Sequence, residues 1–213
     1  VNRAGNCIVD DEAVRRAANN EIIRRYFSAL RDRREGKVDD EAVFRSELIM
    51  NRAGIDVAYR NAVVRAREEA SKTDRPVVAA ELPDGRMVVG KASPLLTASS
   101  AMILNALKIA AGIDDSVLLI SPEVIHSMQR LKVDYLGNRN PRLHIDEMLV
   151  ALSIAANSDP YAERAFAALP SLRGSDVHSS VIISQVDDGL YKKLGMYASS
   201  EPEYQTKCLF HGN

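Results

Sequence analysis

The spacing of apolar and polar residues in the first third of the chain is typical of amphipathic helices. Apolar residues recur every three or four positions, between acidic residues that can cap a helix and glycines that can end one. The predicted helices cover residues 11–35, 40–53 and 57–72. Because their connections are short, we expect three antiparallel neighbours that form a helical subdomain of residues 1–74.

Residues 75–213 combine β-rich runs with further helical patterns. Two apolar runs flank Pro83-Asp84-Gly85, which predicts a β-hairpin. Further strands are predicted at 117–120 ("VLLI"), 178–184 and 196–199. Helices are predicted at 97–111, from Ser121-Pro122, from Asn140-Pro141 to about 157, from Asp159-Pro160, and at 187–194. The fold class is therefore α+β or α/β: the helical subdomain, then a three-layer α/β/α subdomain with a mixed sheet.

The stretch "LGNRNPRLHIDEM" at residues 136–148 is the first candidate for a binding site. Asn140 followed by Pro141 predicts a helix start, which places Arg139 and Arg142 beside the positive end of the helix dipole. A phosphate or carboxylate would find free amides and two guanidinium groups there, with His144 as a further donor. The alternative is that Asp146 and Glu147 neutralise the arginines, or that both arginines reach water.

The second candidate is "GKASPLLTASSAM" at residues 90–102, which joins the hairpin to a helix. Lys91, Ser93 and Thr97 lie around the helix start, and a lysine with small hydroxyl residues at such a turn can hold phosphate. The spacing of a Walker motif is absent, and capping by Thr97 or Ser99 explains the stretch equally well. If both candidate loops lie on one rim of the sheet, they share one ligand in a crevice at the strand ends.

Composition excludes several classes of protein. The chain has 213 residues with a net charge of −1, so no global basic field draws it to nucleic acid or to a membrane. Apolar stretches are far shorter than the ~20 residues that span a bilayer. Without a secretory signal pattern or a cysteine motif, Cys7 and Cys208 are expected to be ordinary thiols of a cytoplasmic protein.

Other groups of polar residues carry weaker signals. The many arginines at residues 15–34 suggest a basic groove, but nearby acids favour a salt-bridged face. The four histidines lack metal-ligand spacing, so we expect no metal site. Among them, His178 is interpreted as a partly exposed residue at the beginning of a strand.

Several strings together resemble a known bacterial family. They include "AGNCIVDDEAV", "ELPDGR", "LISPEVI", "LGNRNPRLH" and "LRGSDVHSSVIISQVD". The chain resembles the C-terminal part of the family called domain of unknown function 1846. The resemblance implies a longer protein whose first half carries a glycine-rich stretch similar to a phosphate loop. It therefore implies ATP with magnesium as a ligand of the whole protein, and no cofactor in this chain. It also implies a cytidine-deaminase-like topology, without the residues of the deaminase zinc site.

Two functional hypotheses follow. The first is a part of a nucleotide-dependent enzyme that binds phosphate or another anion, at Arg139, Asn140, Arg142 and His144 with Lys91, Ser93 and Thr97. The second is an oligomerisation module, in which the helices and residues 193–210 pack against other copies. The expected partners are a phosphate-bearing small molecule and further copies of the chain, with no nucleic acid and no membrane.

Overall fold

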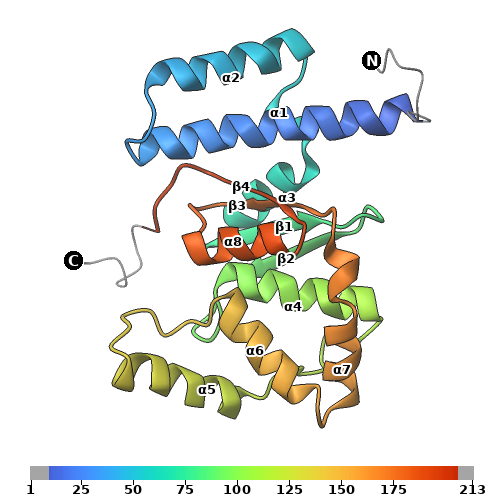
Figure 1. Cartoon of the computed structure of the whole chain (residues 1–213), viewed down its shortest axis with the longest axis vertical. Coiled ribbons are helices and arrows are strands. Elements are labelled where there is room, and N and C mark those ends of the chain that lie inside the picture. The colour runs from blue at the N-terminus through green and yellow to red at the C-terminus, as the bar shows by residue number, and fades with distance from the viewer. Residues whose placement is uncertain (1–9, 206–213) are drawn as a thin grey trace.

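The computed structural model describes residues 10–205, which form eight α-helices and one four-stranded mixed sheet. Figure 1 shows a layered arrangement: a helical hairpin, then a helix on one face of the sheet, the sheet itself, and several helices beyond its other face. The mixed α/β fold with helices on both faces is therefore confirmed. Cys7 and Cys208 lie outside the described residues.

The helical hairpin consists of α1 (Asp11–Arg34) and α2 (Asp40–Ala53). Both helices begin as predicted, because Asp10 and Asp39 accept backbone amides of the first turn. Gly54 ends α2 in the left-handed conformation, with φ of 66°. One face of α1 packs on α2, and α1 also contacts the last strand of the sheet. Four arginines of α1 form ion pairs, which supports the salt-bridged face: Arg24 and Arg25 pair with Glu21, Arg31 with Asp32, and Arg33 with Asp40.

The third predicted helix is interrupted. A 3-10 turn, η1 (Val57–Tyr59), is separated from α3 (Asn61–Ala70) by Arg60, whose backbone is extended. The Arg60 side chain is buried against the sheet, where it donates to Asp176 of β3. As a result α3 packs on the sheet and does not complete a three-helix unit with α1 and α2. The boundary at residue 74 stays a prediction.

The sheet has the order β2-β1-β3-β4. Its strands are β1 (Val77–Glu81), β2 (Met87–Lys91), β3 (Asp176–Ser179) and β4 (Tyr197–Ser200). The predicted hairpin is confirmed, since β1 and β2 pair antiparallel and Gly85 turns the chain with φ of 84°. Because β1 is also antiparallel to β3, and β3 is parallel to β4, the strands β2, β3 and β4 run in one direction.

The predicted strand at 117–120 is wrong. This segment has no regular structure, with Leu119 and Ile120 buried in the core and Leu118 66% exposed. A run of four apolar residues cannot distinguish a strand from an irregular segment that covers a helix. The predicted strand at 178–184 is displaced, because β3 ends at Ser179 and a loop follows.

Helices α4 and α8 lie on the face of the sheet opposite α3, and α6 and α7 cover α4 (Figure 1). The elements of this side are α4 (Ala98–Ala111), α5 (Pro122–Arg130), the π-helix η2 (Leu131–Tyr135), α6 (Ile145–Ala155), α7 (Pro160–Ala167), the 3-10 helix η3 (Leu169–Leu172) and α8 (Gln185–Lys193). Two hydrophobic cores result. The larger lies between the sheet and α4, and a smaller one of Ile23, Phe27, Met50 and Val63 joins the helical hairpin to α3.

Alternation along β2 decides which residues face α4. Gly90 faces α4 so closely that an added Cβ would lie 2.1 Å from the backbone nitrogen of Met102. Only glycine allows this approach of helix and strand. The next residue, Lys91, therefore points to the other face, where its Nζ lies 2.9 Å from Glu69 on α3.

Candidate ligand-binding site

A cavity of about 920 Å³ lies at the edge of the sheet where β2, β3 and β4 end. The loops that follow these strands supply much of its wall, together with residues 140–144 and 204–205. Crevices at the carboxyl ends of parallel strands are frequent ligand sites in α/β proteins. The predicted location, a crevice at the strand ends between the two candidate loops, is therefore where the structure has a cavity.

Three helices begin at this cavity, on the left side of the molecule in Figure 1. The N-cap residue is Thr97 in α4, His144 in α6 and Ser184 in α8. All three of these residues line the cavity. Each helix start presents backbone N–H groups and the positive end of a dipole, so the cavity favours negative charge.

Two of the helix starts leave amides open. In α4 the side chain of Thr97 accepts only from Ser100, and in α8 the side chain of Ser184 accepts from Asp187. Within residues 10–205, the amides of Ala98 and Ser99 in α4, and of Gln185 and Val186 in α8, have no acceptor. Ala98, Ser99 and Gln185 line the cavity, so their amides can serve an anionic ligand.

The start of α6 is already occupied by a carboxylate of the chain. Asp187, from α8, accepts the amide of Ile145 at 3.0 Å and lies 3.1 Å from Nδ1 of His144. Glu147 accepts the amide of His144 at 2.8 Å. The dipole of α6 therefore already faces Asp187, which leaves α4 and α8 as the helices open to a ligand.

The predicted start of α6 at Asn140-Pro141 is wrong by four residues. Leu143 forms a parallel bridge with Leu96, donates to the carbonyl of Leu95, and accepts from the amide of Thr97. This pairing keeps residues 141–143 out of the helix, with a bend at Arg142, and ties the two candidate loops together. Consequently neither Arg139 nor Arg142 lies in the first turn of α6. Asn140 instead folds back locally, with its Oδ1 accepting the amide of Arg142 at 3.1 Å.

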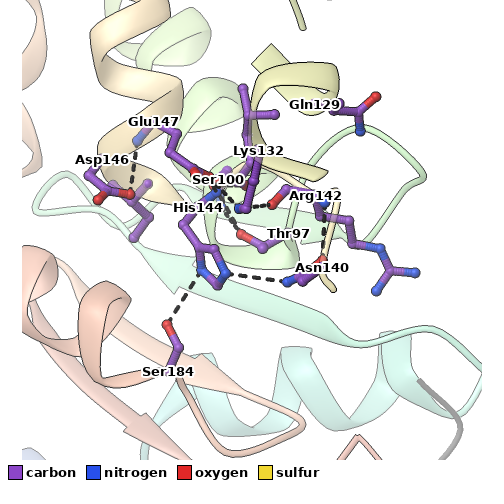
Figure 2. Close-up of polar contacts among 12 residues, drawn as sticks. Thr97, Ser100, Gln129, Lys132, Asn140, Arg142, His144, Asp146, Glu147 and Ser184 are labelled. Carbon is purple, nitrogen blue, oxygen red and sulfur yellow. Dashed lines mark hydrogen bonds and ion pairs between the residues drawn. The ribbon is translucent and has the colours of Figure 1, made fainter. Parts of the chain in front are cut away.

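A nearly buried lysine holds the loop against α6. Nζ of Lys132, in η2, donates to the carbonyl of Arg142 at 2.8 Å and to Oε2 of Glu147 at 2.7 Å. Figure 2 shows Lys132 between these two partners, behind the ring of His144. The alternative interpretation of this stretch had expected Glu147 to neutralise the arginines. Glu147 pairs with Lys132 instead.

The structure brings together four of the seven predicted residues. Thr97, Asn140, Arg142 and His144 line one cavity. The other three lie elsewhere. Lys91 pairs with Glu69 on the opposite face of the sheet, which contradicts its expected place beside Arg142. Ser93 accepts the amides of Leu95 and Leu96 within its own loop, and Arg139 is exposed and does not line the cavity.

His144 is the titratable group whose surroundings are most specific in the cavity. Its hydrogen bond with Asp187 raises the pKa of the imidazole above its ordinary value of 6.5, against the opposing effects of burial and Lys132. Its Nε2 lies 3.3 Å from the side-chain nitrogen Nδ2 of Asn140, and Ser184 Oγ lies 3.5 Å from Nδ1. The side chain remains 23% exposed, so it is reachable from the cavity.

Sequence reasoning missed Asp187, Ser184 and Lys132. Ser184 and Asp187 form the capping pattern S-x-x-D directly after an apolar run, a signal that marks a helix start at a strand end. The contact between Asp187 and His144 joins residues 43 positions apart, and no local pattern encodes it. Lys132 lies in the π-helix "LKVDY", for which the sequence carries no local signal.

No group of three or more His, Cys, Asp or Glu side chains in the described range 10–205 could hold a metal ion. In the same range, no helix is long and apolar enough to cross a bilayer.

Comparison with known proteins gives the family. The profile described as "Domain of unknown function DUF1846, C-terminal" matches residues 58–210, and the profile described as "Domain of unknown function DUF1846, N-terminal" matches residues 1–54. The chain belongs to the DUF1846 family. The DUF1846 resemblance noted from the sequence is thus confirmed. Restriction to the C-terminal part is not supported, because α1 and α2 fall within the match to the N-terminal DUF1846 domain.

Relatives of this DUF1846 chain include two corynebacterial proteins and a streptococcal one. The chain is 50% identical over 210 residues to the UPF0371 protein of Corynebacterium efficiens, and 50% identical over 210 residues to that of Corynebacterium glutamicum. It is 44% identical over 210 residues to the UPF0371 protein of Streptococcus pneumoniae. Each match covers 99% of the chain and 42% of the relative, so the chain spans less than half the length of these relatives.

Proposed function

We propose that the cavity at the starts of α4 and α8 binds a small molecule that carries a phosphate or another oxyanion. One observation carries this proposal: open amides at two helix starts, together with Arg142, line a single cavity. Helix N-termini and a guanidinium group both favour oxyanions, and the amides of two helices can surround one ligand group.

The acidic residues of the cavity do not oppose this assignment. Asp187 is 3% exposed and already accepts hydrogen bonds from His144 and Ile145. Glu35 forms an ion pair with Lys37. Both carboxylates therefore have cationic or donor partners of their own, and the open amides line the same cavity as Arg142 and Asn140.

Another part of the wall is apolar. Pro76, Val78, Val181, Ile182 and Ile183 line the side of the cavity formed by the sheet and the β3–α8 loop. A charged group at the helix starts and an apolar or planar body against this wall would use both surfaces. The volume of about 920 Å³ is large enough for an organic phosphate ester of this kind.

A role in a nucleotide-dependent enzyme rests on the family resemblance, and we keep it as a proposal for the longer relatives. ATP with magnesium belongs in the ligand panel for that reason. The sheet order β2-β1-β3-β4 is compatible with the cytidine-deaminase-like topology. That likeness supports a small-molecule site at the strand ends, without the zinc chemistry of deaminases.

Thermal unfolding with a ligand panel tests the proposal. The panel contains inorganic phosphate, phenyl phosphate, glucose 6-phosphate, and ATP with magnesium. A ligand at ~100 times its dissociation constant stabilises the folded chain by about 2.7 kcal/mol. For a protein of this size we expect the midpoint to rise by roughly 5–11 °C.

Two substitutions in the same loop separate the site from general charge effects. Arg142→Met should remove most of the shift, because Arg142 lines the cavity. Arg139→Met removes the same charge at an exposed position outside the cavity and should leave the shift unchanged. Absence of a shift with every ligand, or equal loss in both variants, would contradict the proposed site.

A second candidate function is assembly, and α2 provides the observation that favours it. Phe44 is 64% exposed and Ile49 is 52% exposed, on an outer helix that packs on α1 with its other face (Figure 1). We propose that this outer face contacts another subunit or another part of the longer family proteins. Homo-oligomerisation predicts a mass above 23.4 kDa by light scattering, reduced by Phe44→Ser with Ile49→Ser. A strict monomer at high concentration would exclude self-association of this chain.

A further inference from the structure

Three groups hold the ring of His144 in a fixed orientation. Nδ1 lies 3.1 Å from Oδ2 of Asp187, and Ser184 Oγ lies 3.5 Å from the same nitrogen. Nε2 lies 3.3 Å from Nδ2 of Asn140. Figure 2 shows the ring between Asn140 and Ser184.

These contacts determine the tautomer of the His144 imidazole when no ligand is in the cavity. Asp187 accepts at Nδ1, so this nitrogen carries a proton. The side chain of Asn140 cannot turn freely, because its Oδ1 accepts the amide of Arg142. Its NH₂ group therefore faces Nε2, and Nε2 must be unprotonated to accept from it.

Protonation of His144 would place two donors opposite each other. The N–H at Nε2 and the NH₂ of Asn140 would then lack an acceptor, unless one entered from the cavity. An oxyanion fits this requirement, because one oxygen can accept from both groups. A neutral ligand with a donor at this point does not fit.

We propose that His144 takes up one proton when an oxyanion enters the cavity, and that its Nε2–H and Asn140 then donate to that anion together. This inference rests on the proposed function of the cavity and adds a protonation state to it. The ligand group is an oxyanion that is fully charged at neutral pH. Above the pKa of His144 in the empty protein, the imidazole is neutral before binding and cationic afterwards.

The charges around His144 make this exchange feasible. Asp187 on α8 and Glu147 on α6 favour the imidazolium, while Lys132 on η2 and burial disfavour it. Arg142 follows Asn140 in the loop and lines the same cavity. The hydrogen bond with Asp187 is the largest of these effects and raises the pKa of His144 in the empty protein. An added anion shifts the pKa further in the same direction.

The consequence is a pH-dependent affinity. Above the pKa of His144, binding requires proton uptake, so the dissociation constant should rise about tenfold for each pH unit. Below that pKa the imidazole is already charged, and the dissociation constant should not change with pH. Sulfate is the suitable probe because its own charge is constant over this range, in contrast to phosphate.

Isothermal titration of the whole chain with sulfate, in two buffers of different ionisation enthalpy, measures the proton count directly. We expect uptake that approaches one proton per sulfate above the pKa of His144. His144→Gln should bind with no uptake and with a pH-independent constant. His126→Gln removes an exposed histidine outside the cavity and should behave like the unmodified chain.

The outcomes separate the inference from the function on which it rests. Sulfate binding without proton uptake at any pH would overturn the inference and leave the anion site intact. Failure to bind sulfate at any pH would contradict both. If His144→Gln does not fold, the proton count of the unmodified chain still decides, because it needs no variant.

Discussion

Two histidines on opposite faces of the sheet each pair with a carboxylate, but the two pairs have different surroundings. His144 pairs with Asp187, and both line the cavity, whereas His178 pairs with Glu201 beneath α1 and α3. His178 is 0% exposed, packs on the ring of Phe27 at 4.5 Å, and shares Ser199 with Arg60. His144 is 23% exposed and lines the cavity.

The difference teaches that a histidine–carboxylate pair does not by itself indicate a site. Around His178, Arg60 donates to Ser199, Asp176 and the carbonyl of Tyr197, and Arg67 pairs with Glu201. This network attaches the N-terminal helices to the sheet, and the His178 side chain within it is 0% exposed. Around His144, by contrast, open amides and a cavity are present. Access, and not the pair, separates binding from structural support.

The largest expected effect comes from breaking the buried network. Arg60→Met leaves Asp176 and Ser199 without their cationic partner, and removal of one member of a buried ion pair typically costs about 3–5 kcal/mol. Urea unfolding measures the change. Arg25→Met removes a 74% exposed partner of Glu21 and should change the free energy of unfolding by less than about 1 kcal/mol.

This pair of variants also sharpens the comparison. If folded Arg60→Met still shows the ligand-dependent shift, the buried network supports the fold alone. Loss of ligand binding in a folded Arg60→Met protein would show that the two faces of the sheet are coupled, contrary to our interpretation.

A smaller effect is expected at the lysine that holds the cavity loop. Lys132→Met removes the donor to the Arg142 carbonyl and to Glu147, at a cost of roughly 1–3 kcal/mol. Ligand binding should weaken as well, because Asn140 and Arg142 lose their anchor. Lys192→Met breaks an exposed pair with Asp188 and should cost less than about 0.5 kcal/mol. Equal unfolding curves for the two variants would contradict the anchoring role of Lys132.

The smallest effects distinguish the two histidines by the sign of their pH dependence. The hydrogen bond with Asp187 raises the pKa of His144, so its stabilisation is complete below about pH 6.5 and is lost as pH rises through the folded pKa. Burial lowers the pKa of His178, although Glu201 opposes this, so its stabilisation is present above about pH 6.5 and is lost in acid.

Substitution of each histidine by glutamine makes these signs measurable between pH 5.5 and 8. His144→Gln should lose more stability at pH 5.5 than at pH 8, and His178→Gln the reverse. We expect the two differences to have opposite signs, because the two folded-state pKa values are displaced in opposite directions. The same sign for both variants would refute the contrast between the two environments.

Local signals in the sequence predicted much of the fold. Asp39 and Gly54 bound α2 as expected, and Pro83-Asp84-Gly85 makes the hairpin. These features depend on residues within a few positions of each other. The run "VLLI" was ambiguous because burial alone does not produce a strand, and His178 was placed at an exposed strand end because the cover by α1 is a tertiary contact.

The candidate site was predictable only in part, for the same reason. Residues Asn140, Arg142 and His144 share one loop, and the bridge between Leu96 and Leu143 brings Thr97 to them. That bridge joins residues 47 positions apart and also delays the start of α6, which the Asn-Pro signal placed too early. The departure of Lys91 follows from strand alternation, once Gly90 is known to face α4.

The most direct test of the central claim is an amide NMR titration of the ¹⁵N-labelled chain with phenyl phosphate. We predict the largest shifts at the amides of Ala98, Ser99, Gln185 and Val186, which are the open ends of α4 and α8. The shifts should saturate together with one dissociation constant and disappear in Arg142→Met. Saturating shifts elsewhere, for example around Arg60 and His178, or no saturation at these four amides, would contradict an anion site at the helix starts.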